Sequence, residues 1–192
     1  DQYKEIIKFS TCNFNKQEKN KIKQAISNIT MKINQLNKNY FKNINIYKLN
    51  KIPWILGLIC NNNYENGLPH TRNNIILIPR EKLYYYSMKK LEKTLIHEKI
   101  HIYQRNYPEE VKYYLNNLGF KKIKKREKND NIRANPDLDN YIYQDKNHNT
   151  YKALYNHDAK SVEDITYYPY DNQKWEHPNE KMAIDFESII IN

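Results

Sequence analysis

Apolar and polar residues alternate along this chain with two different periods, which predict both helices and strands. Between residues 16 and 38, apolar side chains recur every three or four positions among Lys, Gln and Asn, which indicates an amphipathic helix with one buried stripe. The stripe consists of Ile22, Ile26, Ile29, Ile33 and Leu36. We expect it to pack on the core, as part of an N-terminal helical segment that covers residues 1–43.

Shorter apolar runs predict strands, because they alternate with polar residues or end at turn-forming residues. These runs cover residues 44–49, 54–60, 75–78, 141–145, 150–155 and 162–168. A helical pattern returns over residues 82–106, in two pieces, and after Pro178 to about residue 190. Another helix is expected from Pro108 to Gly119, since proline suits a first helical turn and glycine a C-terminal cap.

These elements, with no internal repeat and no evident linker, predict one α+β domain over residues 1–192. The longest apolar run, residues 52–60, is too short to span a membrane, so we expect a soluble protein. The three glycines lie too far apart for a dinucleotide loop or a P-loop. Cys12 and Cys60 form no metal-binding pair, and the sequence leaves open whether they are free thiols or a disulfide.

The chain is basic, with 32 Lys and Arg against 22 Asp and Glu, and a formal net charge of +10. A positive balance of this size is typical of proteins that bind nucleic acid. However, Asn, Lys, Ile and Tyr alone make up just over half of the chain, and all four have mainly AT-rich codons. We therefore expect residues 121–131, which are rich in lysine, to be a solvated connector, with a nucleic-acid patch as the alternative.

The strongest chemical signal is the sequence His97-Glu98-Lys99-Ile100-His101 within the predicted helix. Histidines at i and i+4 lie on one face of a helix, about 40° apart, and both can reach one metal ion. Glu98 lies about 100° round the helix, where it flanks the metal as a general base. The pattern is typical of a catalytic Zn²⁺ site, which takes three protein ligands and leaves a fourth position open.

The third ligand must come from another part of the chain. The metzincin pattern is excluded, because Tyr107 stands where its third histidine would be and Gln104 where its glycine would be. The remaining candidates lie between residues 175 and 183. We favour Glu180, since it falls in a first helical turn with the small Ala183 one turn later, while His177 and Glu176 remain alternatives.

His97-Glu98-x-x-His101, followed by Asn179-Glu180-x-x-Ala183, resembles the gluzincin type of zincin metallopeptidase, in which the later segment supplies the third zinc ligand. Two further pieces are similar to peptidases encoded by large DNA viruses and some bacteria. They are Arg133-Ala134-Asn135-Pro136-Asp137 and Glu176-His177-Pro178-Asn179-Glu180. The chain departs from the thermolysin-like pattern, which has an aspartate four residues after the ligand; Ile184 stands there, and Asp185 comes one residue later.

The resemblance implies a zincin-like fold, with a small mixed or antiparallel sheet, an active-site helix and a C-terminal helix. It also implies that an edge strand of this sheet holds an extended peptide by backbone pairing. We expect residues 74–78 to be this strand, with Asn74 and Ile76 facing the substrate and His70 bordering the cleft. Arg133 and Asn135 either orient the substrate or only build a turn.

Two supporting roles remain to be assigned. Gln104 lies three residues past His101 on the same helix face, so we expect it to hydrogen-bond to the metal site. Gluzincins stabilise the oxyanion with Tyr or His, and Tyr155 and His157 are the candidates because they fall between the two metal-binding segments.

The sequence therefore predicts a zinc-dependent metallopeptidase that acts on a peptide or protein substrate. Two alternatives are a zinc-binding structural or virion component without turnover and a basic nucleic-acid-binding module. The substrate, the oligomeric state and the location, whether virion or host cytoplasm, are not indicated.

Overall fold

The structure of the chain is a computed structural model that describes residues 10–36, 44–61, 67–127, 131–133, 135, 137–161, 163–169 and 175–192. The helices within these ranges are α2 (Lys16–Gln35), α3 (Ile46–Lys51), α4 (Arg80–Tyr85), α5 (Met88–Asn106), α6 (Pro108–Asn117) and α7 (Pro178–Ile191). The strands are β1 (Thr11–Cys12), β2 (Ile55–Ile59), β3 (His70–Arg72), β4 (Ile75–Pro79), β5 (Lys121–Lys125), β6 (Tyr141–Gln144), β7 (Thr150–Tyr155) and β8 (Ile165–Tyr168). The predicted α+β class is confirmed, while the single domain stays a prediction.

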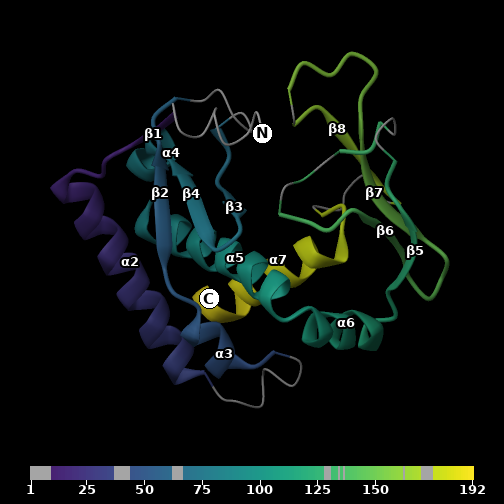
Figure 1. The fold of residues 1–192 in the computed structure, drawn as a ribbon, viewed down its shortest axis with the longest axis horizontal. Coiled ribbons are helices and arrows are strands. Elements are labelled where there is room, and N and C mark those ends of the chain that lie inside the picture. Colours follow the sequence, from purple (N-terminus) through teal and green to yellow (C-terminus); the bar gives the residue numbers. More distant parts are fainter. Residues whose placement is uncertain are drawn as a thin grey trace.

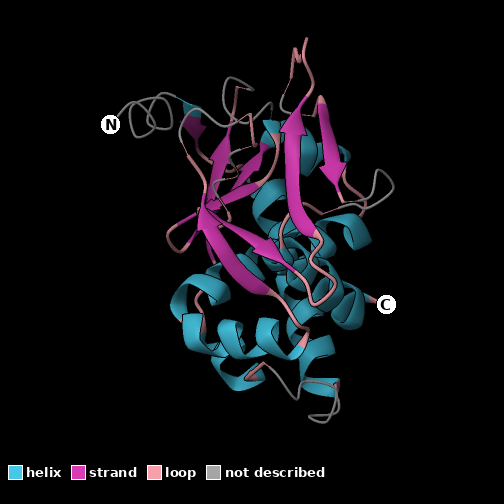
Figure 2. Ribbon diagram, turned by 90° about the vertical axis from the view of Figure 1, so that its right-hand side faces the viewer, coloured by secondary structure: helices cyan, strands magenta, loops and turns pink. Residues whose placement is uncertain are grey.

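Two four-stranded sheets lie on opposite sides of the central helices α5 and α7 (Figure 1). The first sheet is mixed, with the order β1-β2-β4-β3, and only the β2–β4 pair is parallel. The second sheet is an antiparallel meander with the order β5-β6-β7-β8. Turned by 90°, the molecule shows most of its helical residues below the strands (Figure 2).

Helix α5 is the centre of the core, because it packs against α2, α7 and the strands β3 and β4. Nearly every residue from Leu95 to Gln104 is buried or half-buried, including polar ones. A helix that is covered on all sides must satisfy its polar side chains internally. The polar side chains of α5 are therefore the place to look for a functional site.

The helix predicted over residues 16–38 is confirmed as α2. It begins with a capping box, in which the Asn15 side chain accepts from the Glu18 N–H while Glu18 accepts from the Asn15 N–H. Ile22, Ile29 and Ile33 of the predicted stripe are buried. Within the same predicted helical segment, Thr11 and Cys12 form the strand β1 instead, and residues 1–9 and 37–43 lie outside the described residues.

Two predictions of local structure are wrong. Residues 44–49 are not a strand, since Asn45 caps the short helix α3 by accepting a hydrogen bond from the Lys48 N–H. Alternation over so few residues is equally satisfied by one helical turn that buries Leu49. The basic stretch expected to be a connector contains β5, an edge strand whose residues are all exposed. Lysine is well suited to such an edge, because it discourages pairing with other chains.

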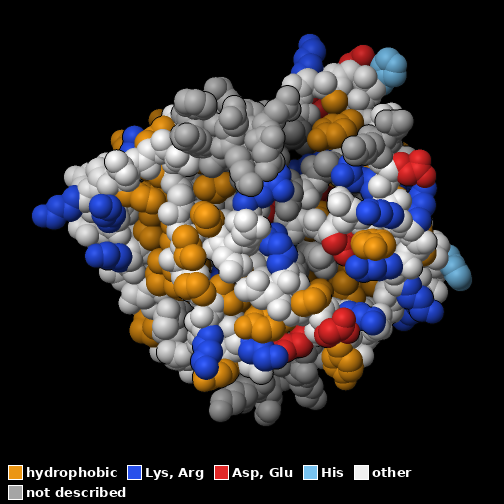
Figure 3. All heavy atoms as spheres, viewed as in Figure 1, with side chains coloured by type: hydrophobic (Ala, Val, Ile, Leu, Met, Phe, Trp, Pro, Cys, Tyr) orange, Lys and Arg blue, Asp and Glu red, His pale blue; other side chains and the backbone are white. Residues whose placement is uncertain are grey.

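The lysines of β5 lie on the side of the molecule that Figure 3 shows as rich in Lys and Arg. Lys122 forms an ion pair with Asp139, with 2.8 Å between Nζ and Oδ2, and its ammonium lies 4.1 Å from the centre of the Tyr141 ring. At least this lysine therefore has a structural partner within the protein. Binding of nucleic acid here stays an untested prediction.

The two cysteines form a disulfide between Cys12 and Cys60, which joins β1 to the end of β2. Of the two states that the sequence left open, the structure therefore contains the disulfide. Among the described helices, none is both long and apolar enough to cross a membrane.

Candidate metal centre

Three side chains from α5 and α7 converge on one point. His97 and His101 lie one turn apart on α5, and Glu180 lies in the first turn of α7, which packs along α5. The two histidine Nε2 atoms are 3.1 Å apart. Glu180 places Oε2 3.3 Å from His97 Nε2 and Oε1 3.4 Å from His101 Nε2. These three residues form a group that could hold a metal ion.

The nitrogen and oxygen atoms of this group lie close enough together to share one metal ion. Zinc–ligand bonds of about 2.0–2.1 Å at tetrahedral angles separate neighbouring ligand atoms by about 3.3–3.4 Å. The two Nε2 atoms are 3.1 Å apart, and each lies 3.3 or 3.4 Å from a different carboxylate oxygen of Glu180. Without a bound cation or shared protons, lone pairs at this distance would repel one another. The residues present could therefore hold a metal ion.

Hydrogen bonds at the far side of each imidazole orient its Nε2 toward the other ligands. His97 Nδ1 lies 3.0 Å from Glu187 Oε2, and His101 Nδ1 lies 2.8 Å from Gln104 Oε1. Since both partners can accept, each Nδ1 is placed to donate a hydrogen bond, which leaves each Nε2 facing the other members of the group. Gln104 is fixed in turn, because its amide donates to the Asn179 carbonyl at 2.8 Å.

Sequence reasoning missed Glu187, although its spacing from Glu180 along the predicted C-terminal helix could have indicated it. Asp185 is the nearest acid to the thermolysin-like pattern, but it accepts from Lys181 Nζ at 2.6 Å and from the Tyr114 hydroxyl at 3.3 Å. Glu187 lies seven residues after Glu180, which is two turns of α7 and therefore the same helix face. The carboxylate that contacts His97 thus comes from an i+7 position.

The two alternatives for the third ligand have other partners. His177 caps α7 by accepting from the Asn179 N–H, and its Nε2 lies 2.9 Å from Asp139 Oδ1. Glu176 pairs with Arg133, with 3.2 Å between Oε1 and Nη1. Neither belongs to the convergent group, whereas Glu180 does.

The electrostatics of this site follow from burial and close charges. Burial alone would raise the pKa of Glu180, but His101 and His97 hold it well below its usual value. The pKa of Glu98 is raised to about 8, first by burial and then by the charge of Asp137. Glu98 Oε2 is buried and has no hydrogen-bond partner among the described residues. A buried carboxylate with a free oxygen, next to a metal group, is suited to accept a proton.

A cavity of about 190 Å³ opens onto the group. It is lined by Leu68, Pro69, His70, His97, Glu98, Arg133, Asn135, Asp137, Tyr167, Glu176 and Glu180. The structure therefore brings His70, Arg133 and Asn135 to the site, and Asn135 donates to Glu180 Oε1 at 3.1 Å.

Four of the residues predicted to bind the substrate or to stabilise the oxyanion do not line this cavity. Ile76 is buried in the core with 1% of its surface exposed, and Asn74 lies in the exposed turn between β3 and β4. Tyr155 ends β7, and the exposed side chain of His157 contacts Asp158.

The tyrosine that does line the cavity is Tyr167 of β8, which sequence reasoning missed. Its position depends on the pairing of β7 with β8, for which the sequence around it gives no specific signal.

The prediction that residues 74–78 form the edge strand at the cleft is wrong as well. β4 lies between β2 and β3, so β3 is the edge strand on this side of the first sheet. The Thr71 N–H of β3 donates to Asp137 Oδ1 at 2.6 Å, as does the Thr71 hydroxyl at 2.7 Å. Arg105 also contacts the Thr71 hydroxyl. Because Asp137 already takes this N–H, a peptide cannot pair with it.

No known protein family, curated protein or solved structure matches the chain. The interpretation of this site therefore rests on its own geometry.

Proposed function

We propose that this protein is a zinc-dependent metallopeptidase in which His97, His101 and Glu180 hold the metal. The observation that carries the proposal is the convergence of these three side chains beside the unpartnered oxygen of Glu98. Zinc in such a site acts as a Lewis acid, which makes water easier to deprotonate and a carbonyl easier to attack.

In the proposed reaction, Glu98 is the general base. Its raised pKa and free Oε2 suit a group that takes a proton from the attacking water as the water oxygen bonds to the carbonyl carbon. Glu98 then delivers this proton to the nitrogen of the leaving amine as the C–N bond breaks. The carboxylate is thereby regenerated, and the peptide bond is replaced by an acid and an amine.

Tyr167 is our candidate for stabilising the oxyanion, in place of Tyr155 and His157. It lines the cavity together with His97, Glu98 and Glu180, and its hydroxyl has no hydrogen-bond partner among the residues described. A hydroxyl that is free in the resting protein can donate to the negative charge that develops on the carbonyl oxygen. His70, Arg133 and Asn135 would border the substrate, because all three line the cavity.

The test is Glu98→Gln, with Glu81→Gln on the exposed side of α4 as the matched control. Zinc content, measured by mass spectrometry of the intact protein, should be equal in the two variants and the wild type. Hydrolysis of a library of unstructured peptides should fall by about 10²–10⁴-fold in Glu98→Gln only. Cleavage that survives this substitution refutes the mechanism, and zinc without cleavage in the wild type supports a non-catalytic metal protein.

A further inference from the structure

The helix α7 is capped by His177, three residues before the candidate ligand Glu180. Pro178 has no N–H, so the first backbone donor of the helix is that of Asn179, and His177 Nδ1 accepts it at 3.1 Å. A glutamate at the third helical position often bonds back to the N-cap N–H, but Glu180 faces the two histidines of the metal group instead. The side-chain cap of α7 therefore comes from the imidazole of His177.

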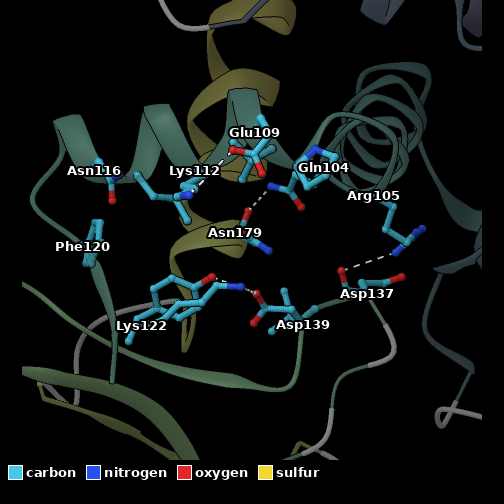
Figure 4. A pocket seen from close by; sticks show the side chains of 15 residues that line it. Gln104, Arg105, Glu109, Lys112, Asn116, Phe120, Lys122, Asp137, Asp139 and Asn179 are labelled. Carbon is cyan, nitrogen blue, oxygen red and sulfur yellow. Dashed lines mark hydrogen bonds and ion pairs between the residues drawn. The ribbon is translucent and has the colours of Figure 1, made fainter. Parts of the chain in front are cut away.

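The first turn of α7 borders a second cavity through Asn179. This cavity has a volume of about 490 Å³, and Asp139 lies across it from Asn179 (Figure 4). The Asn179 side chain adds no anchor on this side, because its Oδ1 is buried without a hydrogen-bond partner in the described part of the chain. The backbone of Asn179 is held instead: its carbonyl accepts from Gln104 Nε2 at 2.8 Å, and its N–H donates to His177. These hydrogen bonds fix the turn where it meets open space instead of packed side chains.

The tautomer of His177 follows from its two neighbours. Nδ1 accepts from a backbone N–H, which can only donate, so Nδ1 carries no proton. Nε2 lies 2.9 Å from Asp139 Oδ1 and is therefore the protonated nitrogen, which donates to that carboxylate. The imidazole is buried, and its ring meets that of Tyr143 edge to face, with 4.6 Å between the ring centres. One orientation and one tautomer of His177 thus serve both hydrogen bonds.

Asp139 is itself held in place by residues of the second sheet. Its Oδ2 accepts from the Tyr143 hydroxyl and from Lys122 Nζ, both at 2.8 Å, and its Oδ1 also accepts from the Tyr141 N–H at 3.0 Å. Figure 4 shows the Lys122 ammonium directed at the Asp139 carboxylate. Burial alone would raise the pKa of Asp139, but the hydrogen bonds that it accepts, first that of His177, hold it below its usual value. Asp139 is therefore a fixed acceptor for the His177 ring.

We propose that Asp139 and His177 act as a positioning pair for the metal centre. Asp139 fixes the tautomer of His177, His177 then caps α7, and the capped turn presents Glu180 to the metal. The pair rests on the proposed function, in which Glu180 is a zinc ligand. It connects the second sheet to the ligand set, so a change at Asp139 alters the affinity for zinc although Asp139 contacts none of the three ligands.

The first experiment tests the tautomer and needs no metal. Long-range proton–nitrogen NMR of the metal-free protein at neutral pH distinguishes the two ring nitrogens of His177. The wild type should give the signals of a neutral ring that is protonated at Nε2. A ring that is protonated at Nδ1, or at both nitrogens, overturns the proposal, because such a ring cannot accept from the Asn179 N–H.

The second experiment measures the Kd for zinc by competition with a chromogenic chelator. His177→Ala removes the cap and should raise the Kd about 10–100-fold, the usual effect of losing a group that orients a metal ligand. His177→Asn keeps a side chain that caps helices well and should stay within about three-fold of the wild type. The matched control is His157→Asn, since the His157 side chain is 98% exposed. Equal losses in the two His177 variants, or a loss in neither, overturn the proposal.

A double-mutant cycle distinguishes the pair from a general loss of stability, and it does not require His177→Ala to fold. Asp139→Asn should weaken zinc binding at least about ten-fold in the wild type. In the His177→Asn background the same change should cost less than about three-fold, because the new side chain caps α7 without help from Asp139. An equal loss in both backgrounds refutes the pair.

The outcomes also separate the pair from the proposed function. Zinc binding that none of these variants changes overturns the pair and leaves the peptidase. If the wild type binds no zinc, the peptidase fails, and amide hydrogen exchange of the metal-free protein decides the pair. Exchange at residues 179–181 should then be at least about ten-fold faster in Asp139→Asn than in the wild type or His177→Asn, and equal rates overturn the pair.

Discussion

The contact between His97 and Glu187 offers the sharpest test of the metal centre, because Glu187 touches a ligand without being one. Its carboxylate lies 3.0 Å from His97 Nδ1 and is only 20% exposed. It fixes the ring orientation and makes Nε2 a better donor. Loss of such a partner typically weakens metal binding 10–100-fold, which is about 1.4–2.7 kcal/mol at 25 °C. Glu187→Ala should therefore raise the Kd for zinc by this factor.

The assay is competition for zinc between the protein and a chromogenic chelator at one fixed neutral pH. Glu187→Gln keeps an acceptor oxygen for His97 and should lose less than about ten-fold in affinity. The control is Asp185→Asn on the same helix, since Asp185 contacts Lys181 and Tyr114 instead of a ligand. An unchanged Kd in Glu187→Ala, or an equal loss in the control, would refute the assigned ligand geometry.

Three predictions concern stability. Reduction of the Cys12–Cys60 disulfide, whose cysteines are 48 residues apart, should lower the free energy of unfolding by about 4 kcal/mol in urea titrations; an unchanged midpoint would contradict this. Asp139→Asn should cost about 1.5–3 kcal/mol at neutral pH. Because the folded state lowers the pKa of Asp139, the wild type should lose this advantage as the pH falls below about 4, and a difference that widens in acid would count against the ion pair. Gly57→Ala brings a Cβ to 2.7 Å from Leu77 Cδ2 and should lower Tm by an amount equivalent to about 1 kcal/mol.

Local periodicity was sufficient to predict the elements whose signal lies within one helix or strand. The stripe of α2, the two-piece helix of α4 and α5, and the strands β6 and β7 all follow from the order of apolar residues. Periodicity failed where a segment is short, as in α3, or where a strand is exposed on both faces, as in β5. In those cases a cap or an edge position decides the conformation, and neither leaves a hydrophobic pattern.

The sequence by itself determined that His97 and His101 share a helix face with Glu98 beside them, because 3.6 residues per turn leave no other arrangement. It also narrowed the third ligand to a short segment and favoured Glu180 within it, and the packing of α7 along α5 then brought Glu180, but neither Glu176 nor His177, into the group with the two histidines. The same packing brought Glu187 to His97 across 90 residues of sequence. Tertiary structure alone decided the closed edge at Thr71, the place of Tyr167 and the second cavity. These features join segments that are far apart in the chain, and contacts of that kind depend on how whole elements pack.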